Sequence, residues 1–132
     1  MAQILLIEDQ ANQRQLYHEE LTDEGHEVKS AGNGREALEL FQRSRPQLVI
    51  MDILLPGMNG IEVMERMLAS DPYLPIIVHS AYSSPSHDFI SWFARAYVVK
   101  SGDLQPLKNE VRKALSGTPV VESQSQSGLV SA

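Results

Sequence analysis

The chain has 132 residues, of which 42% are hydrophobic, so it corresponds to one domain that can bury a core of its own. It contains no cysteine, which excludes disulfide bonds and thiolate metal sites. Its formal net charge of −6 argues against nucleic acid or an anionic membrane as a direct partner, because binding to phosphate groups requires clustered Lys and Arg.

Short apolar runs alternate with longer segments of helical periodicity along the chain. This alternation predicts βαβ units and a parallel sheet. The predicted strands are residues 4–7, 27–31, 48–51, 76–79 and 97–99.

The first two predicted helices are marked by inward residues and by end signals. Tyr17 and Leu21 stand one turn apart in the first helix, and Gly25 supplies its C-terminal stop. Asn33 can cap the second helix, which ends before Pro46 because the residue before a proline disfavours the α region.

Three more helices follow. The third comes after turn residues 56–60, and its predicted inward side chains are Ile61, Met64 and Leu68. Ser84 followed by Pro85 marks the start of the fourth. Asp103 can cap the fifth, whose predicted inward side chains are Leu104, Leu107, Val111 and Leu115.

The strict alternation of five strands and five helices places residues 1–117 in the α/β class. With right-handed crossovers it predicts a flavodoxin-like doubly wound (βα)5 domain, with a parallel five-stranded sheet in the order 2-1-3-4-5. Residues 118–132 are rich in Ser and Gln and lack periodicity, so they are predicted to form a disordered tail.

Polar residues that can take part in phosphoryl chemistry follow four of the predicted strands. They are Glu8 and Asp9 after the first strand, Asp52 after the third, Ser80 after the fourth and Lys100 after the fifth. The carboxyl ends of parallel strands share one edge, where open α/β sheets bind ligands. We therefore expect these side chains to meet in one pocket.

The three carboxylates predict a metal site. Carboxylates brought within about 4–6 Å of one another repel each other unless a cation lies among them. Mg²⁺ takes oxygen ligands and typically uses one or two carboxylates, which suits Asp9 and Asp52, with Glu8 acting directly or through water. Any one of the three alone is more often a helix cap or a solvated loop residue, so the prediction depends on the combination.

Asp52 is the predicted nucleophile, because it ends the central strand and a carboxylate can form an acyl phosphate when a metal and a cation neutralise the attacked group. Lys100 supplies the cation, as a compact charge that can reach a phosphoryl oxygen. The Ser80 hydroxyl can donate to another phosphoryl oxygen.

Four short motifs are similar to those of one known family. They are Glu8-Asp9, Asp52 with Pro56-Gly57 and Gly60 behind it, Ser80-Ala81, and Tyr97-Val98-Val99-Lys100. In combination they resemble the receiver domain of two-component response regulators, over about residues 3–117. The resemblance implies a cytoplasmic phosphoprotein of signal transduction, which agrees with the absence of any stretch long enough to span a membrane.

The resemblance also implies roles for single residues. Asp52 would accept a phosphoryl group from a phosphohistidine on a sensor histidine kinase or a phosphotransfer protein. Glu8, Asp9, Asp52 and the backbone carbonyl of Leu54 would arrange Mg²⁺. Lys100 and Ser80 would hold the phosphoryl oxygens.

A switch and an output surface are implied in the same way. Ser80 and Tyr97 would form the switch, with Tyr97 as its rotating aromatic residue. The fourth helix, fifth strand and fifth helix would form the face that binds a downstream protein. The aromatic residues near Trp92 cover more than one helical stripe, so either they leave apolar area for such a partner or Trp92 packs over the edge of a neighbouring helix.

Two departures from the family pattern are visible. Ser101 follows Lys100 where family members usually have proline in a cis peptide, which leaves the geometry of this loop open. No output domain follows Gly117, so the chain resembles either a stand-alone receiver or a receiver cut from a longer protein.

Four other functions are alternatives to the receiver. A phosphorelay intermediate and an unphosphorylated pseudo-receiver share the same fold. A phosphohydrolase with an aspartate nucleophile would need a general acid two residues after Asp52, where Leu54 stands. A mononucleotide binder would bring phosphate against Glu8 and Asp9, which repel it. The chain is expected to be a phosphoacceptor with at most autodephosphorylation activity, and not an enzyme.

Overall fold

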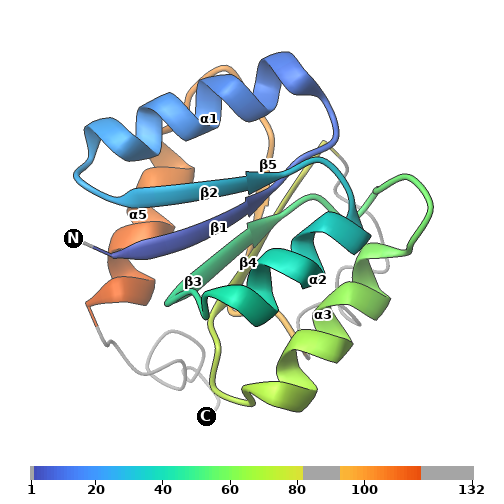
Figure 1. Ribbon diagram of the computed structural model, residues 1–132. Coiled ribbons are helices and arrows are strands. Elements are labelled where there is room, and N and C mark those ends of the chain that lie inside the picture. The colour runs from blue at the N-terminus through green and yellow to red at the C-terminus, as the bar shows by residue number, and fades with distance from the viewer. Residues whose placement is uncertain (1, 82–92, 117–132) are drawn as a thin grey trace, which may run out of the picture.

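The computed structural model describes residues 2–81 and 93–116 (Figure 1). In chain order the described elements are β1 (Gln3–Ile7), α1 (Ala11–Asp23), β2 (Glu27–Ala31), α2 (Gly34–Arg43), β3 (Leu48–Met51), α3 (Gly60–Ser70), β4 (Ile76–Ser80), β5 (Ala96–Val99) and α5 (Gln105–Leu115). The fourth helix predicted from Ser84, the aromatic residues around Trp92 and the tail at residues 118–132 lie outside the described residues.

The described strands form one parallel sheet in the order β2-β1-β3-β4-β5, which confirms the predicted topology. Ile7 of β1 lies opposite Ala31 of β2 and Met51 of β3, so these strands end at one level. Main-chain hydrogen bonds continue beyond that level, because Glu8 N–H donates to the Ala31 carbonyl (3.0 Å) and Asp52 N–H to the Ile7 carbonyl (3.1 Å). The sheet itself therefore fixes the backbone of Glu8 and Asp52.

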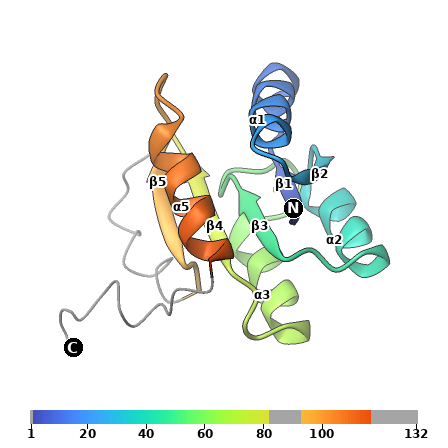
Figure 2. The same cartoon turned by 90° about the vertical axis from the view of Figure 1, so that its left-hand side faces the viewer.

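Helices cover both faces of the sheet, with α2 and α3 on one face and α1 and α5 on the other (Figure 2). Alternate residues of β3 serve the two faces: Val49 and Met51 pack with α2 and α3, whereas Leu48 and Ile50 pack with α1 and α5. Burial on both sides explains why the strand reads as a continuous apolar run.

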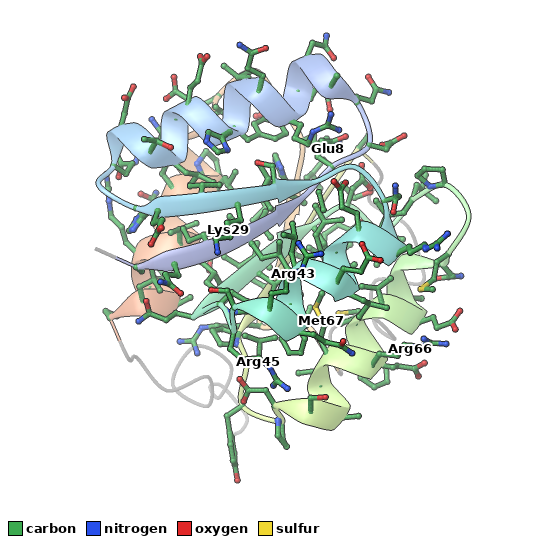
Figure 3. The ribbon with its side chains drawn as sticks, in the orientation of Figure 1. Glu8, Lys29, Arg43, Arg45, Arg66 and Met67 are labelled. Carbon is green, nitrogen blue, oxygen red and sulfur yellow. The ribbon has the colours of Figure 1, made fainter. Side chains whose placement is uncertain are left out.

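Because both faces of the sheet are apolar, the buried residues Glu8, Asp52 and Ser80 lie at its carboxyl edge. Figure 3 shows Glu8 at this edge, whereas Met67 of α3 lies in the core and is fully buried.

The start of α5 differs from the prediction. The helix begins at Gln105, with Leu104 at the N-cap position and no side-chain cap, whereas Asp103 was the expected cap. Asp103 still accepts a hydrogen bond from Gln105 N–H through Oδ1 (3.0 Å), so it serves the first turn from one residue outside the N-cap. The buried residues of this helix are Leu107, Val111 and Ala114, and the expected Leu104 and Leu115 are partly buried.

The inward face of α3 is rotated from the predicted one. Val63, Met64 and Met67 are buried, whereas Ile61 and Leu68 pack at the margin of the core. Apolar residues occur on both stripes, so helical periodicity alone does not determine which stripe packs. At the end of β4 the strand runs one residue further than predicted and includes Ser80.

A glycine lets the loop after β3 approach the start of α3. A Cβ on Gly60 would lie 2.5 Å from the Ile53 carbonyl oxygen, and the Gly60 N–H donates to that oxygen at 3.3 Å. The contact holds the chain immediately after Asp52 close to α3.

We expect Gly60→Ala to lower the free energy of unfolding by about 1–3 kcal/mol, because the added methyl must displace the Ile53 carbonyl. Gly102→Ala is the matched control, since a Cβ there meets nothing within 4 Å, and it should change stability by less than about 0.5 kcal/mol. Urea unfolding measures both variants. Equal effects would contradict the close approach at Gly60.

Candidate functional site

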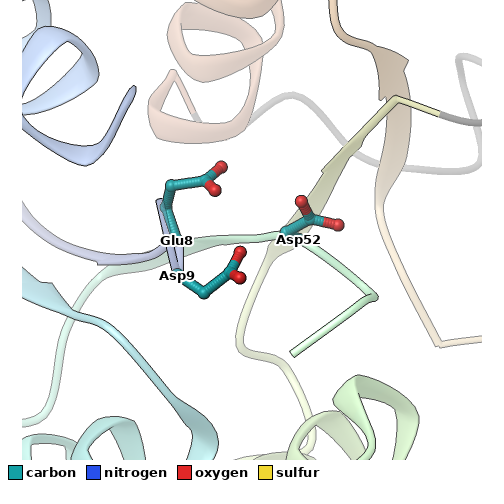
Figure 4. A group of neighbouring side chains, drawn as sticks. All are labelled: Glu8, Asp9 and Asp52. Atoms are coloured by element: carbon teal, nitrogen blue, oxygen red, sulfur yellow. The ribbon is translucent and has the colours of Figure 1, made fainter. Parts of the chain in front are cut away.

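Three carboxylates meet at the carboxyl edge of the sheet. Glu8 and Asp9 follow β1, Asp52 follows β3, and ligand oxygens of the three lie within 4.8 Å of one another (Figure 4). Glu8 and Asp52 are buried, with 2% and 8% of their surface exposed, whereas Asp9 is exposed. Adjacent strands β1 and β3 thus bring together the acidic residues that the sequence singled out.

Lys100 reaches this cluster from the end of the edge strand β5. It follows β5, and its Nζ lies 2.6 Å from Glu8 Oε1 and 2.8 Å from Asp52 Oδ2. Its main-chain N–H donates to the Ser80 carbonyl at 2.7 Å, which anchors the backbone beyond the last strand pair. The predicted meeting of Lys100 with the carboxylates is present in the structure.

Asp52 is held through both carboxylate oxygens. Oδ1 accepts a hydrogen bond from Leu54 N–H at 3.0 Å, and Oδ2 lies against the Lys100 ammonium. The Leu54 main chain is therefore next to Asp52, while its side chain is 55% exposed. The metal-binding role of the Leu54 carbonyl stays a prediction.

Ser80 and Tyr97 lie on the two neighbouring strands β4 and β5. Ser80 is buried at the end of β4, opposite Val99, and Tyr97 lies opposite Val78 and packs partly buried against the core. Tyr97 is therefore in the strand that leads to Lys100, and Ser80 is in the strand next to it. A bond from the Ser80 hydroxyl to a phosphoryl group, and a rotation of Tyr97, stay predictions.

Burial and charge act in opposite directions on the titrating groups. Burial raises the pKa of the Glu8 carboxyl, and the hydrogen bonds from Lys100 and Gln10 N–H reduce this rise without cancelling it. Burial would lower the pKa of Lys100, but its hydrogen bonds to Asp52 and Glu8 outweigh burial and raise that pKa. Lys100 therefore stays charged at neutral pH.

An aromatic pair next to the site adds no charge to it. The rings of Tyr17 and His79 pack edge to face, with centroids 4.9 Å apart. Burial, with a smaller effect of Lys100, lowers the pKa of His79 to about 4, and burial raises the pKa of the Tyr17 hydroxyl. Both side chains are neutral at pH 7, and His79 is a buried strand residue as predicted.

The cluster has the composition of a divalent cation site. Three carboxylates and one ammonium leave a formal charge of −2, and all the candidate ligands are hard oxygen atoms. Within residues 2–81 and 93–116 no other group of three acidic, histidine or cysteine side chains is close enough to share an ion.

The loop after Lys100 is free of a cis bond. Every peptide bond in the described residues is trans, including the one between Lys100 and Ser101. Ser101 Oγ instead organises the turn locally, as it donates to the Asp103 carbonyl (2.9 Å) and accepts from the Asp103 N–H (3.2 Å). The geometry that the sequence left open is thereby defined.

Two residues of the site were missed in the sequence. Gln13 of α1 accepts a hydrogen bond from Lys100 Nζ at 3.0 Å, and Arg14 donates to the carbonyls of Glu8 (2.8 Å) and Asp9 (3.4 Å). Gln13 stands four residues before the buried Tyr17, so a polar residue on the inward stripe of α1 was the available signal.

Comparisons with known proteins agree with this geometry. The family model described as "Response regulator receiver domain" matches residues 4–112. Sporulation initiation phosphotransferase F of Bacillus subtilis is 32% identical over 114 residues, which cover 85% of this chain and 92% of that protein.

Solved structures give the same result. The chain is similar to response regulator protein TrrA from Thermotoga maritima in complex with Mg²⁺-BeF, at 42% identity and a TM-score of 0.82, with 86% of this chain and 99% of that chain covered. It is also similar to a chain in the complex of histidine kinase ThkA with TrrA, at 43% identity and a TM-score of 0.80, with 87% and 99% covered. These matches do not favour a phosphorelay intermediate, a pseudo-receiver or a phosphohydrolase.

The raised pKa of Glu8 predicts a pH dependence of stability. A carboxyl whose pKa rises on folding binds more protons in the folded state between its ordinary pKa of 4.5 and the raised value, so folding is favoured as the pH falls through that window. Without divalent cations, the stability of the wild-type protein relative to Glu8→Gln should therefore increase from neutral pH towards pH 4.5. Urea unfolding at several pH values measures it. A relative stability that decreases would mean that the Lys100 pair, and not burial, dominates at Glu8.

Proposed function

The chain belongs to the response regulator receiver domain family, and from this membership we propose that it accepts a phosphoryl group on Asp52 from a histidine kinase or a phosphotransfer protein. One observation carries the assignment to Asp52. Its buried carboxylate ends the central strand, within 2.8 Å of the Lys100 ammonium and beside two further carboxylates. The transfer would give a two-component system its phosphorylated output state.

In the proposed reaction Asp52 is the nucleophile. A carboxylate oxygen attacks the phosphorus of a phosphohistidine, so that an O–P bond forms while the P–N bond breaks and the imidazole nitrogen leaves with the electron pair. Asp52 N–H donates to the Ile7 carbonyl, and Asp52 Oδ1 accepts from Leu54 N–H, so the attacking carboxylate is held in place. Lys100 offers its charge where the phosphoryl oxygens must lie.

We propose Mg²⁺ as the cofactor, because the donor set fits it in charge and in ligand type. Asp9, Asp52 and the backbone carbonyl of Leu54 would hold the ion, with Glu8 binding directly or through water. When bound, Mg²⁺ supplies positive charge that neutralises the phosphoryl oxygens during transfer. The Mg²⁺-BeF complex of TrrA supports this choice by similarity.

The proposed response to phosphorylation uses Ser80 and Tyr97. A phosphoryl group on Asp52 would bring acceptor oxygens towards Lys100 and the Ser80 hydroxyl, and movement of Ser80 would give Tyr97 room to change rotamer. One or two charge-assisted hydrogen bonds, at about 1.5–3 kcal/mol each, are enough to change the populations of two states by tenfold or more.

The proposed partners are proteins. The complex of TrrA with histidine kinase ThkA supports a kinase as phosphodonor. A groove of about 600 Å³ between β5 and α5, lined by residues that include Tyr97, Val99, Pro106 and Lys113, supports a downstream protein on the face of the fourth helix, fifth strand and fifth helix. The fourth helix of that face lies outside the described residues.

We also propose where the protein acts and which reactions it catalyses by itself. The net charge of −6 supports the proposal that the chain does not bind nucleic acid directly. None of the described helices is long and apolar enough to cross a membrane. We propose a cytoplasmic phosphoacceptor whose own chemistry is limited to autodephosphorylation.

We expect acetyl phosphate with Mg²⁺ to add one phosphoryl group to the wild-type protein and none to Asp52→Asn, because Asp52 is the carboxylate that follows the central strand β3 and contacts Lys100. Intact-mass analysis measures the adduct. Asp103→Asn is the matched control and should be phosphorylated normally, since an amide oxygen can replace the carboxylate that accepts from Gln105 N–H. An adduct that persists in Asp52→Asn would remove Asp52 from its role.

Asp9→Asn should weaken Mg²⁺ binding by about tenfold or more, because it removes a charged ligand. Without Mg²⁺ the same change should stabilise the protein by up to about 1 kcal/mol, because it relieves repulsion among the carboxylates. NMR titration and urea unfolding measure the two effects. Asp23→Asn, at the other end of α1, is the control for Mg²⁺ binding and should leave the affinity unchanged. Unchanged Mg²⁺ affinity in Asp9→Asn would exclude Asp9 as a ligand.

A further inference from the structure

Lys100 makes a hydrogen bond that the proposed phosphoryl chemistry does not use. Its Nζ donates to Gln13 Oε1 at 3.0 Å, in addition to its contacts with Glu8 (2.6 Å) and Asp52 (2.8 Å). A lysine ammonium has three N–H donors and no acceptor. These three side chains therefore account for every N–H of a side chain that is only 13% exposed.

Gln13 is itself held in place by its neighbours in the first turn of α1. Arg14 Nη1 donates to the Glu8 carbonyl at 2.8 Å, which ties this turn to the end of β1. One turn later Tyr17 is 5% exposed and packs against the ring of His79 on β4. Gln13 is partly buried between these two anchors, so its amide oxygen reaches Lys100 from a fixed backbone.

We propose that Gln13 is a positioning residue for Lys100, an inference that rests on the proposed phosphotransfer to Asp52. In the resting site the ammonium is shared among Glu8, Asp52 and Gln13. When Asp52 is phosphorylated, the N–H that points to Asp52 turns to a phosphoryl oxygen, while Glu8 and Gln13 keep the other two N–H groups. The Lys100 ammonium is then already oriented towards the phosphoryl group, and its side chain does not have to change rotamer.

A neutral acceptor suits this task. A carboxylate at position 13 would make the formal charge of the cluster more negative, from −2 to −3, and would repel the three carboxylates already present. An apolar side chain would leave one N–H of Lys100 without its protein acceptor. The amide orients the ammonium and leaves the charge available to the cation and the phosphoryl group.

The contact can be tested directly by the hydrogen exchange of the Lys100 ammonium, followed by ¹⁵N NMR of the side chain in the full chain. Gln13→Met removes the acceptor at similar length and should speed exchange by about tenfold or more, as expected for the loss of one hydrogen bond to a charged group. Gln13→Glu keeps an acceptor and should keep exchange slow. Gln15→Met makes the same change at an exposed position of α1 that contacts Glu19, and should have no effect.

Phosphorylation kinetics test the positioning role. With saturating acetyl phosphate and Mg²⁺, Gln13→Met should lower the maximal rate at Asp52 by about three- to tenfold, with little change in the concentration for half-maximal rate. Gln15→Met should match the wild type.

The possible outcomes separate this inference from the proposed function. Wild-type exchange and rate in Gln13→Met, an equal loss in Gln15→Met, or fast exchange in Gln13→Glu would each overturn the role of Gln13. A wild-type protein that takes no phosphoryl group would contradict the proposed function instead, and the Lys100 exchange rates would then still decide whether Gln13 holds the ammonium.

Discussion

A lysine ammonium shared between two buried carboxylates is the interaction on which the site depends. Lys100 comes from β5, Glu8 from β1 and Asp52 from β3, so the contact forms only when these strands lie in one sheet. Removing one partner of such a buried pair costs about 3–5 kcal/mol, because the other charge is left unpaired, yet the intact pair adds little net stability. The fold thus maintains a cluster of charges that contributes more to chemistry than to stability.

Before any phosphoryl group arrives, Asp52 already has partners that its proposed phosphorylation would have to displace. Lys100 Nζ donates to Asp52 Oδ2, and Leu54 N–H donates to Oδ1. Both oxygens of the proposed nucleophile therefore have hydrogen-bond donors in the resting site. The Leu54 bond and the strand-end bond of Asp52 orient the carboxylate without neutralising it. The Lys100 bond does neutralise it, and for that reason its release towards the phosphoryl oxygens must accompany the reaction.

The sequence predicted the parts of the structure that depend on burial on both faces of the sheet. Such strands are continuous apolar runs, and their order follows from right-handed crossovers, so the edge that carries Glu8, Asp52 and Lys100 could be located in advance. The inward stripe of α3 could not, because apolar residues lie on both of its candidate faces. Gln13 was missed for another reason: glutamine is usually exposed, and only its place one turn before Tyr17 indicated a buried role.

Lys100 also connects two helices on one face of the sheet. Through Gln13 it is bonded to the first turn of α1, and through residues 101–104 its backbone leads directly into α5. Further along, the same helices are joined by Lys108–Glu20 (2.7 Å) and Arg112–Glu24 (2.8 Å). Such partly exposed pairs add little to stability, so they align the helices without locking them. The partly buried Gln13 contact is the one in this series that reaches the charged cluster, and it therefore links the position of α1 to the charge next to Asp52.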